Sequence, residues 1–248
     1  MKILTIGTLL LVSGVVSANN FHYHPYEELG QKQHGDLVIQ QVYSPESQAT
    51  KNLINVWPNR TIPYLFEESI DENQQAIILS AMEAIQDVSC IRFIPKLENH
   101  INYVLITADA SGCWSSLGMH GGEQYMNLDP RGCMQKGAVL HQLMHVLGFI
   151  HPSSRPDRDL FVKVELDNVN LYEQSQFDQV EPGAFDDFGM TYDYDSILHR
   201  SGLAFSATGQ HTIIPLHEEV VLGQRETLSF KDIRKLNRSY CTLVPDNE

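Results

Sequence analysis

The sequence has few basic residues and few long apolar runs, and each shortage excludes a class of protein. Lys and Arg number 17 against 31 Asp and Glu, so the formal net charge is −14. A chain this acidic is repelled by nucleic-acid phosphates and anionic lipid surfaces, and we expect neither as a partner. Beyond the first residues, no apolar run is long enough to cross a membrane. Internal repeats and low-complexity tracts are also missing.

The remaining composition is that of an ordinary globular protein. Apolar residues make up 42% of the chain and charged residues 19%, which is not typical of a disordered chain. A length of 248 residues is enough for one substantial core, or for one domain divided into two lobes around a cleft.

The N-terminus indicates export. A basic start at Met1-Lys2 precedes an apolar run over residues 3–16, and Val16-Ser17-Ala18 supplies small residues before a cleavage site. This pattern predicts a signal peptide over residues 1–18 and a secreted, extracellular protein.

If the protein is exported, its cysteines can form disulfides and two of its asparagines can be glycosylated. An even number of cysteines in an oxidising compartment predicts two disulfides, and the spacing alone leaves three pairings open among Cys90, Cys113, Cys133 and Cys241. Asn59 and Asn237 each begin a glycosylation acceptor pattern. Asn59 lies in a predicted loop. Asn237 falls inside a predicted helix, so for this residue we expect glycosylation and its absence equally.

The order of elements predicts an α+β chain that follows a polar leader. Residues 19–51 are polar and lack a sustained period, so we expect an extended leader without a core of its own. Asp71 and Ser229 are expected to cap helices. The predicted elements are a turn followed by a strand over 57–66, strands over 90–94 and 102–106, one edge strand within 111–133, and helices over 71–88, 135–148 and 229–241.

The candidate metal ligands lie in one short stretch of the sequence. His141 and His145 are four residues apart on a predicted helix, so both imidazoles lie on one face and can share a metal ion. Gly148 can take the positive φ that ends the helix, and His151 then supplies a third nitrogen ligand. Three histidines leave one tetrahedral position open, which is typical of catalytic zinc sites. The spacing predicts one bound Zn²⁺.

With this motif the chain resembles the astacin family of metzincins. The resemblance covers residues 52–241 and includes Arg155-Pro156-Asp157-Arg158-Asp159, Gly112-Cys113-Trp114-Ser115 and the Ser196-Ile197-Leu198-His199 turn. It implies a two-lobed metalloprotease fold with zinc at the floor of a cleft, and disulfides Cys90–Cys241 and Cys113–Cys133.

The resemblance also gives the leader a role. In this family a Gly-Asp in the propeptide places its carboxylate on the zinc, and His34-Gly35-Asp36-Leu37 matches that pattern. Gln33 departs from it, because the family has an aromatic residue there, and an incidental turn at Asp36 stays an alternative. The implied division is a signal peptide over 1–18, a propeptide-like leader over 19–51 and a metalloprotease domain over 52–248.

Four positions depart from the family at the site of chemistry. Gln142 stands where active members have the Glu that serves as general base, and a neutral amide cannot accept and return a proton. Arg200 stands at the position of the family tyrosine that steadies the transition state, unless it turns outward to pair with Asp193 or Asp195. Pro152 replaces an acidic residue that anchors the mature N-terminus, and Leu198 replaces methionine.

These departures favour a protein that binds without cutting. We expect a secreted, monomeric, zinc-bound pseudoprotease with a peptide or protein in its cleft. The first alternative is an active zinc endopeptidase of weak or unusual activity, and the second is a structural protein that has lost zinc.

Overall fold

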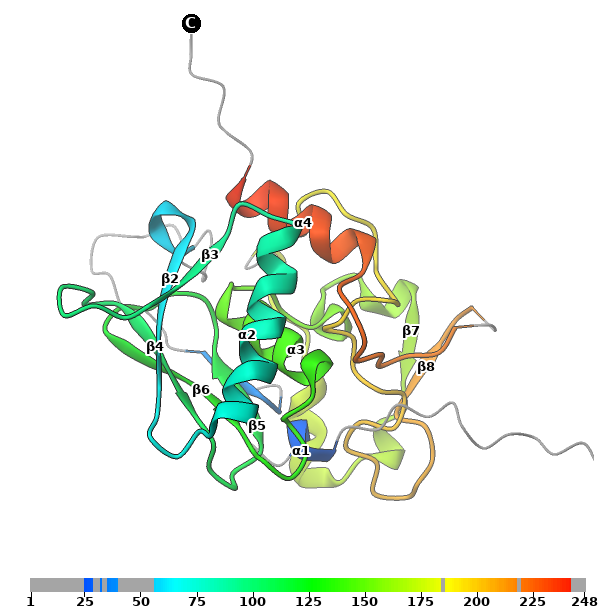
Figure 1. Cartoon of the computed structure of the whole chain (residues 1–248). Coiled ribbons are helices and arrows are strands. Elements are labelled where there is room, and N and C mark those ends of the chain that lie inside the picture. The colour runs from blue at the N-terminus through cyan, green and yellow to red at the C-terminus, as the bar shows by residue number, and fades with distance from the viewer. Residues whose placement is uncertain are drawn as a thin grey trace, which may run out of the picture.

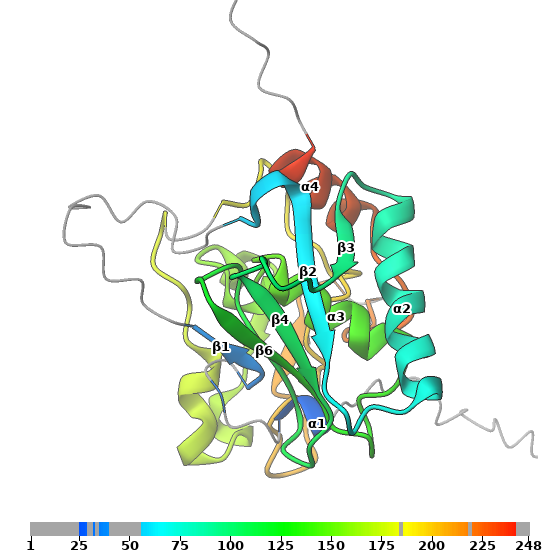
Figure 2. The same cartoon turned by 60° about the vertical axis from the view of Figure 1, so that its left-hand side comes forward.

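A six-stranded mixed sheet forms the centre of the computed structural model (Figures 1 and 2). The structure describes residues 25–28, 32, 35–39, 56–183, 186–217 and 220–241. The only antiparallel pair in the sheet, among these residues, joins β5 and β6. The strand order is β1 (Leu37–Val38), β5 (Cys113–Ser116), β6 (Glu123–Leu128), β4 (Tyr103–Thr107), β2 (Thr61–Phe66) and β3 (Arg92–Pro95).

Two helices, α2 (Glu72–Asp87) and α3 (Lys136–Val146), pack on one face of this sheet (Figure 2). The strands alternate, so Val104 and Ile106 on β4 point to that face and join the helices in one buried cluster. Asp71 caps α2 in a reciprocal capping box with Gln74, as the sequence predicts. The packing holds α3 rigidly behind the strands.

The C-terminal part of the chain is irregular and has a second core. Here α4 (Phe230–Tyr240) begins at the predicted cap, Ser229, and a short antiparallel pair joins β7 (Val162–Val164) to β8 (Ile213–Pro215). A separate buried cluster includes Val162, Phe177 and Ile213. Two cores agree with the predicted two-lobed α+β fold. The 3₁₀ segments are Pro58–Arg60, Pro152–Ser154, Arg158–Leu160, Leu166–Asn168 and Leu171–Phe177.

The leader is part of the sheet, which corrects the expectation of a segment without a core. Leu37 and Val38 form β1 and pair in parallel with Ser115 and Ser116 of β5. Leu37 is 1% exposed. The structure has two strands within 111–133, β5 next to the leader and β6 inside the sheet, which corrects the expectation of a single edge strand. The leader covers the outer edge of β5. A second leader piece, α1 (Pro25–Glu28), contacts β5 as well.

Two disulfides link distant parts of the fold. Cys90 is bonded to Cys241, which links the start of β3 to the end of α4, and Cys113 is bonded to Cys133. These are the pairs that the resemblance implies. Within the described part of the chain, no helix has the length and apolar character of a membrane span. The signal peptide, Gln33, His34 and the boundary near residue 52 lie outside the described residues.

Candidate metal centre

Helix α3 carries two of the predicted ligands into the interior. His141 and His145 lie one turn apart and are both fully buried. Every residue of α3 from Gly137 to Val146 is buried, because the helix lies between the sheet and the C-terminal lobe. The two ring centroids are 4.6 Å apart, so both imidazoles can contact one metal ion.

The third histidine arrives through the turn that the sequence predicts. Gly148 has a φ of 94°, and its N–H donates to His145 O at 2.8 Å, which closes the helix. The chain then reverses and brings His151, 1% exposed, beside these two imidazoles. Its ring centroid lies 4.7 Å from that of His145.

Backbone carbonyls orient the two helical histidines. Nδ1 of His141 lies 2.8 Å from Ile197 O, and Nδ1 of His145 lies 2.7 Å from Phe149 O. A carbonyl oxygen only accepts, so each Nδ1 carries the proton and each Nε2 presents a lone pair. The two Nε2 atoms face each other at 2.9 Å. Two opposed lone pairs at this distance repel unless a cation lies between them.

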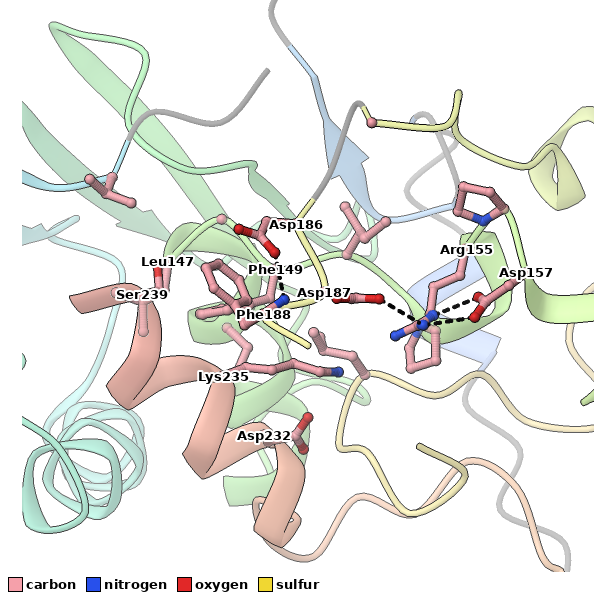
Figure 3. Close-up of a pocket in the computed structure, with 18 of the residues that line it drawn as sticks. Leu147, Phe149, Arg155, Asp157, Asp186, Asp187, Phe188, Asp232, Lys235 and Ser239 are labelled. Carbon is pink, nitrogen blue, oxygen red and sulfur yellow. Dashed lines mark hydrogen bonds and ion pairs between the residues drawn. The ribbon is translucent and has the colours of Figure 1, made fainter. Parts of the chain in front are cut away.

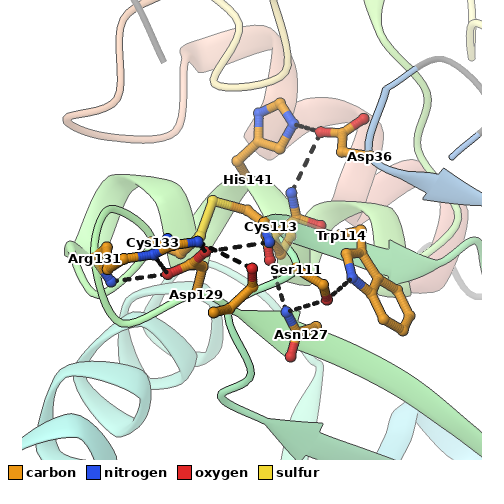
Figure 4. The surroundings of a disulfide bond; sticks show 12 residues. Asp36, Ser111, Cys113, Trp114, Asn127, Asp129, Arg131, Cys133 and His141 are labelled. Carbon is orange, nitrogen blue, oxygen red and sulfur yellow. Dashed lines mark hydrogen bonds and ion pairs between the residues drawn. A yellow bond between two sulfur atoms is a disulfide. The ribbon is translucent and has the colours of Figure 1, made fainter. Parts of the chain in front are cut away.

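A carboxylate from the leader completes the group (Figure 4). Asp36 is 2% exposed, and its Oδ2 lies 2.7 Å from His141 Nε2 and 3.4 Å from His145 Nε2. Its Oδ1 lies 3.3 Å from His151 Nε2 and accepts no hydrogen bond within the described structure.

The donor set fits one zinc ion. Ligand atoms from Asp36, His141, His145 and His151 all lie within 4.8 Å of one another. Three imidazoles and one carboxylate are ligands that Zn²⁺ accepts in tetrahedral geometry. Within the described part of the chain, Oδ1 of Asp36 accepts no hydrogen bond, and the Nε2 lone pairs of His141 and His145 face each other. A cation bound between these atoms would satisfy all three. With Asp36 in place, the fourth position is filled and the site has the closed form.

The surroundings favour the metal-binding protonation states of His145, His151 and Asp36. Burial lowers the pKa of His145 and lowers the pKa of His151 further, although Asp36 opposes both shifts. Burial by itself would raise the pKa of Asp36, but the three histidines outweigh it and hold that pKa well below its ordinary value. Neutral imidazoles and an ionised carboxylate are the forms that bind a metal.

Gln142 lies beside the group, on the same helix. It is fully buried, its Nε2 donates to Asp36 Oδ2 at 3.3 Å, and its Oε1 has no hydrogen-bond partner among the described residues. The buried side chain therefore faces the metal group and presents an amide to it.

Arg200 points inward and approaches His151. It is 5% exposed, which rules out the outward orientation, and its guanidinium lies 5.8 Å from the Phe177 ring and 5.5 Å from the Phe205 ring. Its Nη2 is 3.5 Å from His151 Nδ1. If His151 ligates through Nε2, its Nδ1 carries a proton and two N–H donors oppose each other. In the other tautomer Nδ1 accepts from Arg200, so the contact is favourable only while His151 binds no metal through Nε2.

Gln176 connects Arg200 to the leader, a role that sequence reasoning missed. Arg200 Nη1 donates to Gln176 O at 2.6 Å, and Gln176 Oε1 accepts from Gly35 N at 2.6 Å. Arg200 thus reaches the leader indirectly, through Gln176. No local signal marks Gln176, because the leader contact spans 141 residues.

The two milder departures lie next to a separate cavity (Figure 3). Leu198 is buried in the core that contains α3, and both Leu198 and Pro152 line a cavity of about 460 Å³. Position 152 supplies no charge, but Asp157, Asp186 and Asp187 also line the cavity. Of these carboxylates, Asp157 and Asp187 are both paired with Arg155.

The two glycosylation candidates differ in accessibility. Asn59 is exposed in the Pro58–Arg60 turn. Asn237 lies on α4, and its Nδ2 donates to Val88 O at 2.7 Å and to Ile233 O at 2.9 Å. A glycan on Asn237 would disrupt this pair of hydrogen bonds, so the geometry favours Asn59.

Comparison with known proteins points to one family. The family model described as Astacin, a peptidase family, matches residues 49–241. The zinc metalloproteinase nas-14 of Caenorhabditis elegans is 39% identical over 186 residues, which is 75% of this chain and 37% of the relative. The zinc metalloproteinase nas-13 of the same organism is 36% identical over 86% of this chain and 48% of its own length. The chain thus spans less than half the length of these two relatives.

Solved structures agree on the fold. High choriolytic enzyme 1, a hatching enzyme zinc-protease of Oryzias latipes, superposes with a TM-score of 0.70 at 32% identity and covers 75% of this chain and 93% of its own. Myroilysin matches with a TM-score of 0.55 at 19% identity over 76% of this chain and 97% of its own, which shows similarity of fold alone.

Proposed function

The chain belongs to the astacin family of zinc peptidases, and on that premise we propose that it is a secreted member that binds peptides without cutting them efficiently. Residues 1–18 would be a signal peptide, 19–51 a propeptide-like leader and 52–248 the metalloprotease domain. The ligand would be a peptide or protein segment lying along β5 and reaching the metal group.

One observation carries this proposal. Gln142 occupies the interior position next to His141, faces the metal ligands, and presents an amide where a proton acceptor is needed. An amide has no accessible protonated and deprotonated pair at neutral pH. Loss of a general acid–base group removes about two to four orders of magnitude of rate.

The chain's own residues otherwise keep the site intact. His141, His145 and His151 would hold Zn²⁺, which when bound acts as a Lewis acid and acidifies coordinated water. Ile197 O and Phe149 O fix the ring orientation of the first two ligands. The ability to hold the metal is therefore separate from the ability to move a proton.

The alternative is an active zinc endopeptidase. The complete histidine set and the named zinc metalloproteinases among the relatives favour it. It requires a proton acceptor other than Gln142. Among the described residues, the metal group contains a single carboxylate, Asp36, and that residue belongs to the leader.

A paired assay separates the two functions. Zinc content and hydrolysis of denatured casein would be measured on the purified chain before and after trypsin treatment, with and without a chelator. We expect one zinc ion per chain and no chelator-sensitive hydrolysis. Chelator-sensitive turnover comparable to that of an active family member would establish the alternative.

A glycan on Asn59 is a further part of the proposal. Its exposure in a turn supports the modification, and the hydrogen-bonded amide of Asn237 speaks against a second one. Peptide mass measurement on protein from a secreting host would identify the occupied site.

A further inference from the structure

A small socket for an aromatic ring lies away from the metal group, next to the Cys113–Cys133 disulfide. Tyr26 of the leader packs against the main core there. A Cβ atom on Gly132 would come within 1.8 Å of the Tyr26 ring. The ring therefore lies directly on the Gly132 backbone, at a distance that any larger residue would prevent.

A charged residue forms one side of this socket. The guanidinium of Arg131 lies 5.9 Å from the centroid of the Tyr26 ring, within the range of a cation–π interaction. Asp129, fully buried, accepts from Arg131 Nε at 2.9 Å and from Nη2 at 2.6 Å. This two-point ion pair fixes the plane of the guanidinium (Figure 4).

The socket is fixed by parts of the domain and not by the leader. Cys133 N and Gly132 N both donate to Asp129 O, at 2.8 and 3.1 Å, and the disulfide ties the turn to β5. Arg131 Nη2 also donates to Ala110 O at 2.9 Å. These contacts therefore join residues of the domain itself.

A second leader contact involves Trp114 on β5. Lys32 Nζ is 4.4 Å from the centre of the Trp114 ring, and the Trp114 indole N–H donates to Ser111 Oγ at 3.1 Å. The leader thus touches the domain at Tyr26, then at Lys32, and then at Asp36 in the metal group. Tyr26 precedes Asp36 by ten positions.

We propose that Gly132, Arg131 and Trp114 form a peptide-binding subsite that is independent of the metal. Its ligand is a peptide that presents an aromatic residue from a short helical turn and, further along its chain, a basic residue, and Tyr26 and Lys32 of the leader occupy it in this structure. The inference rests on the proposed peptide-binding function and deepens it by naming the ligand class. A segment of another protein with this pattern competes with the leader for the same surface.

The test uses the full chain with Tyr26→Ala, which empties the socket, and a fluorescent synthetic peptide of residues 20–32, which lacks Asp36. We expect saturable binding that falls at least tenfold when Gly132→Ala is added. Gly132 is not among the positive-φ glycines, so alanine fits its backbone. A peptide carrying Tyr26→Ala should fail to bind, and one carrying Tyr26→Phe should bind normally.

Binding that Gly132→Ala leaves unchanged would overturn the proposal, and so would binding that a chelator abolishes. If Gly132→Ala lowers the yield of folded protein, hydrogen exchange over residues 25–28 tests the proposed subsite instead. Amide protection over residues 25–28 should be lower in the Tyr26→Ala chain than in the wild type and unchanged in the Tyr26→Phe chain. Equal protection in the two variants would refute the socket. Because the peptide does not reach the metal, its binding is separable from proteolysis, and an active enzyme would refute the proposed function alone.

Discussion

The amide nitrogen of Gln142 lies 3.3 Å from Oδ2 of Asp36, so the residue that replaces the general base donates a hydrogen bond to the leader. A carboxylate at position 142 would instead place two like charges at this distance. The substitution that removes a proton acceptor therefore also favours the leader-bound state. On the proposed function, loss of catalysis and firmer leader binding would be two consequences of one residue.

The first prediction is that Gln142→Glu loosens the leader. Two unit charges at this separation repel by several kcal/mol at an effective dielectric constant of about 20, so amide exchange over residues 35–39 should rise roughly tenfold or more. Hydrogen exchange with mass spectrometry measures this. Gln142→Met, uncharged and of similar length, is the control for the lost hydrogen bond alone. Equal protection in the Glu variant and the wild type would contradict the prediction.

The second prediction concerns activity. After trypsin has removed the leader, Gln142→Glu should raise kcat/KM on a quenched peptide by about two orders of magnitude, because a proton acceptor returns. The gain should stay partial while Arg200 opposes His151. Gln142→Glu with Arg200→Tyr should exceed the product of the two single effects, as for residues that act together. Chelator-sensitive wild-type turnover that the Glu variant does not improve would instead support the active alternative.

The third prediction concerns the metal. The purified chain should retain one Zn²⁺ on dialysis, held by His141, His145 and His151, and His145→Ala should lose it. His120→Ala is a matched control, because His120 lies outside the metal group and its pKa is also lowered by burial. Zinc retained equally by His145→Ala and the wild type would show that the assignment is wrong.

The fourth prediction ranks the disulfides. Removing Cys90–Cys241, which closes a separation of 151 residues, should cost about 5 kcal/mol of unfolding free energy in the loop-entropy account. Removing Cys113–Cys133, which closes a separation of 20, should cost about 3 kcal/mol. Denaturant unfolding of the paired Cys→Ser variants gives both values, and the reverse ranking would show that native-state contacts dominate.

The fifth prediction is a loss of stability in acid that depends on His199. Burial lowers the pKa of His199 to about 4, and Tyr192 Oη lies 2.8 Å from its Nε2. The unfolded chain protonates this group at about pH 6.5, so it binds more protons than the folded chain between these values, and stability falls as pH falls through that window. The loss amounts to about 3 kcal/mol. Unfolding curves across this window should show a shallower pH dependence in His199→Gln, and an equal slope would refute the claim.

The sequence alone predicted what depends on local spacing. Helical periodicity and the cap at Asp71 predicted α2, and the histidine spacing with Gly148 predicted the turn that brings His151 back. Resemblance to the family supplied the disulfide pairs and the two-lobed fold. These features depend on neighbours within a few turns of chain, or on motifs that are themselves contiguous.

Only the tertiary structure placed residues that meet across long separations. It turned Arg200 inward to His151, joined Gln176 to Gly35, laid the leader strand on β5 and seated Tyr26 on Gly132. Each contact arises because two cores pack on either side of α3 and leave one edge strand for the leader. Periodicity records which face of an element is buried, but it contains no information about the distant segment that covers that face.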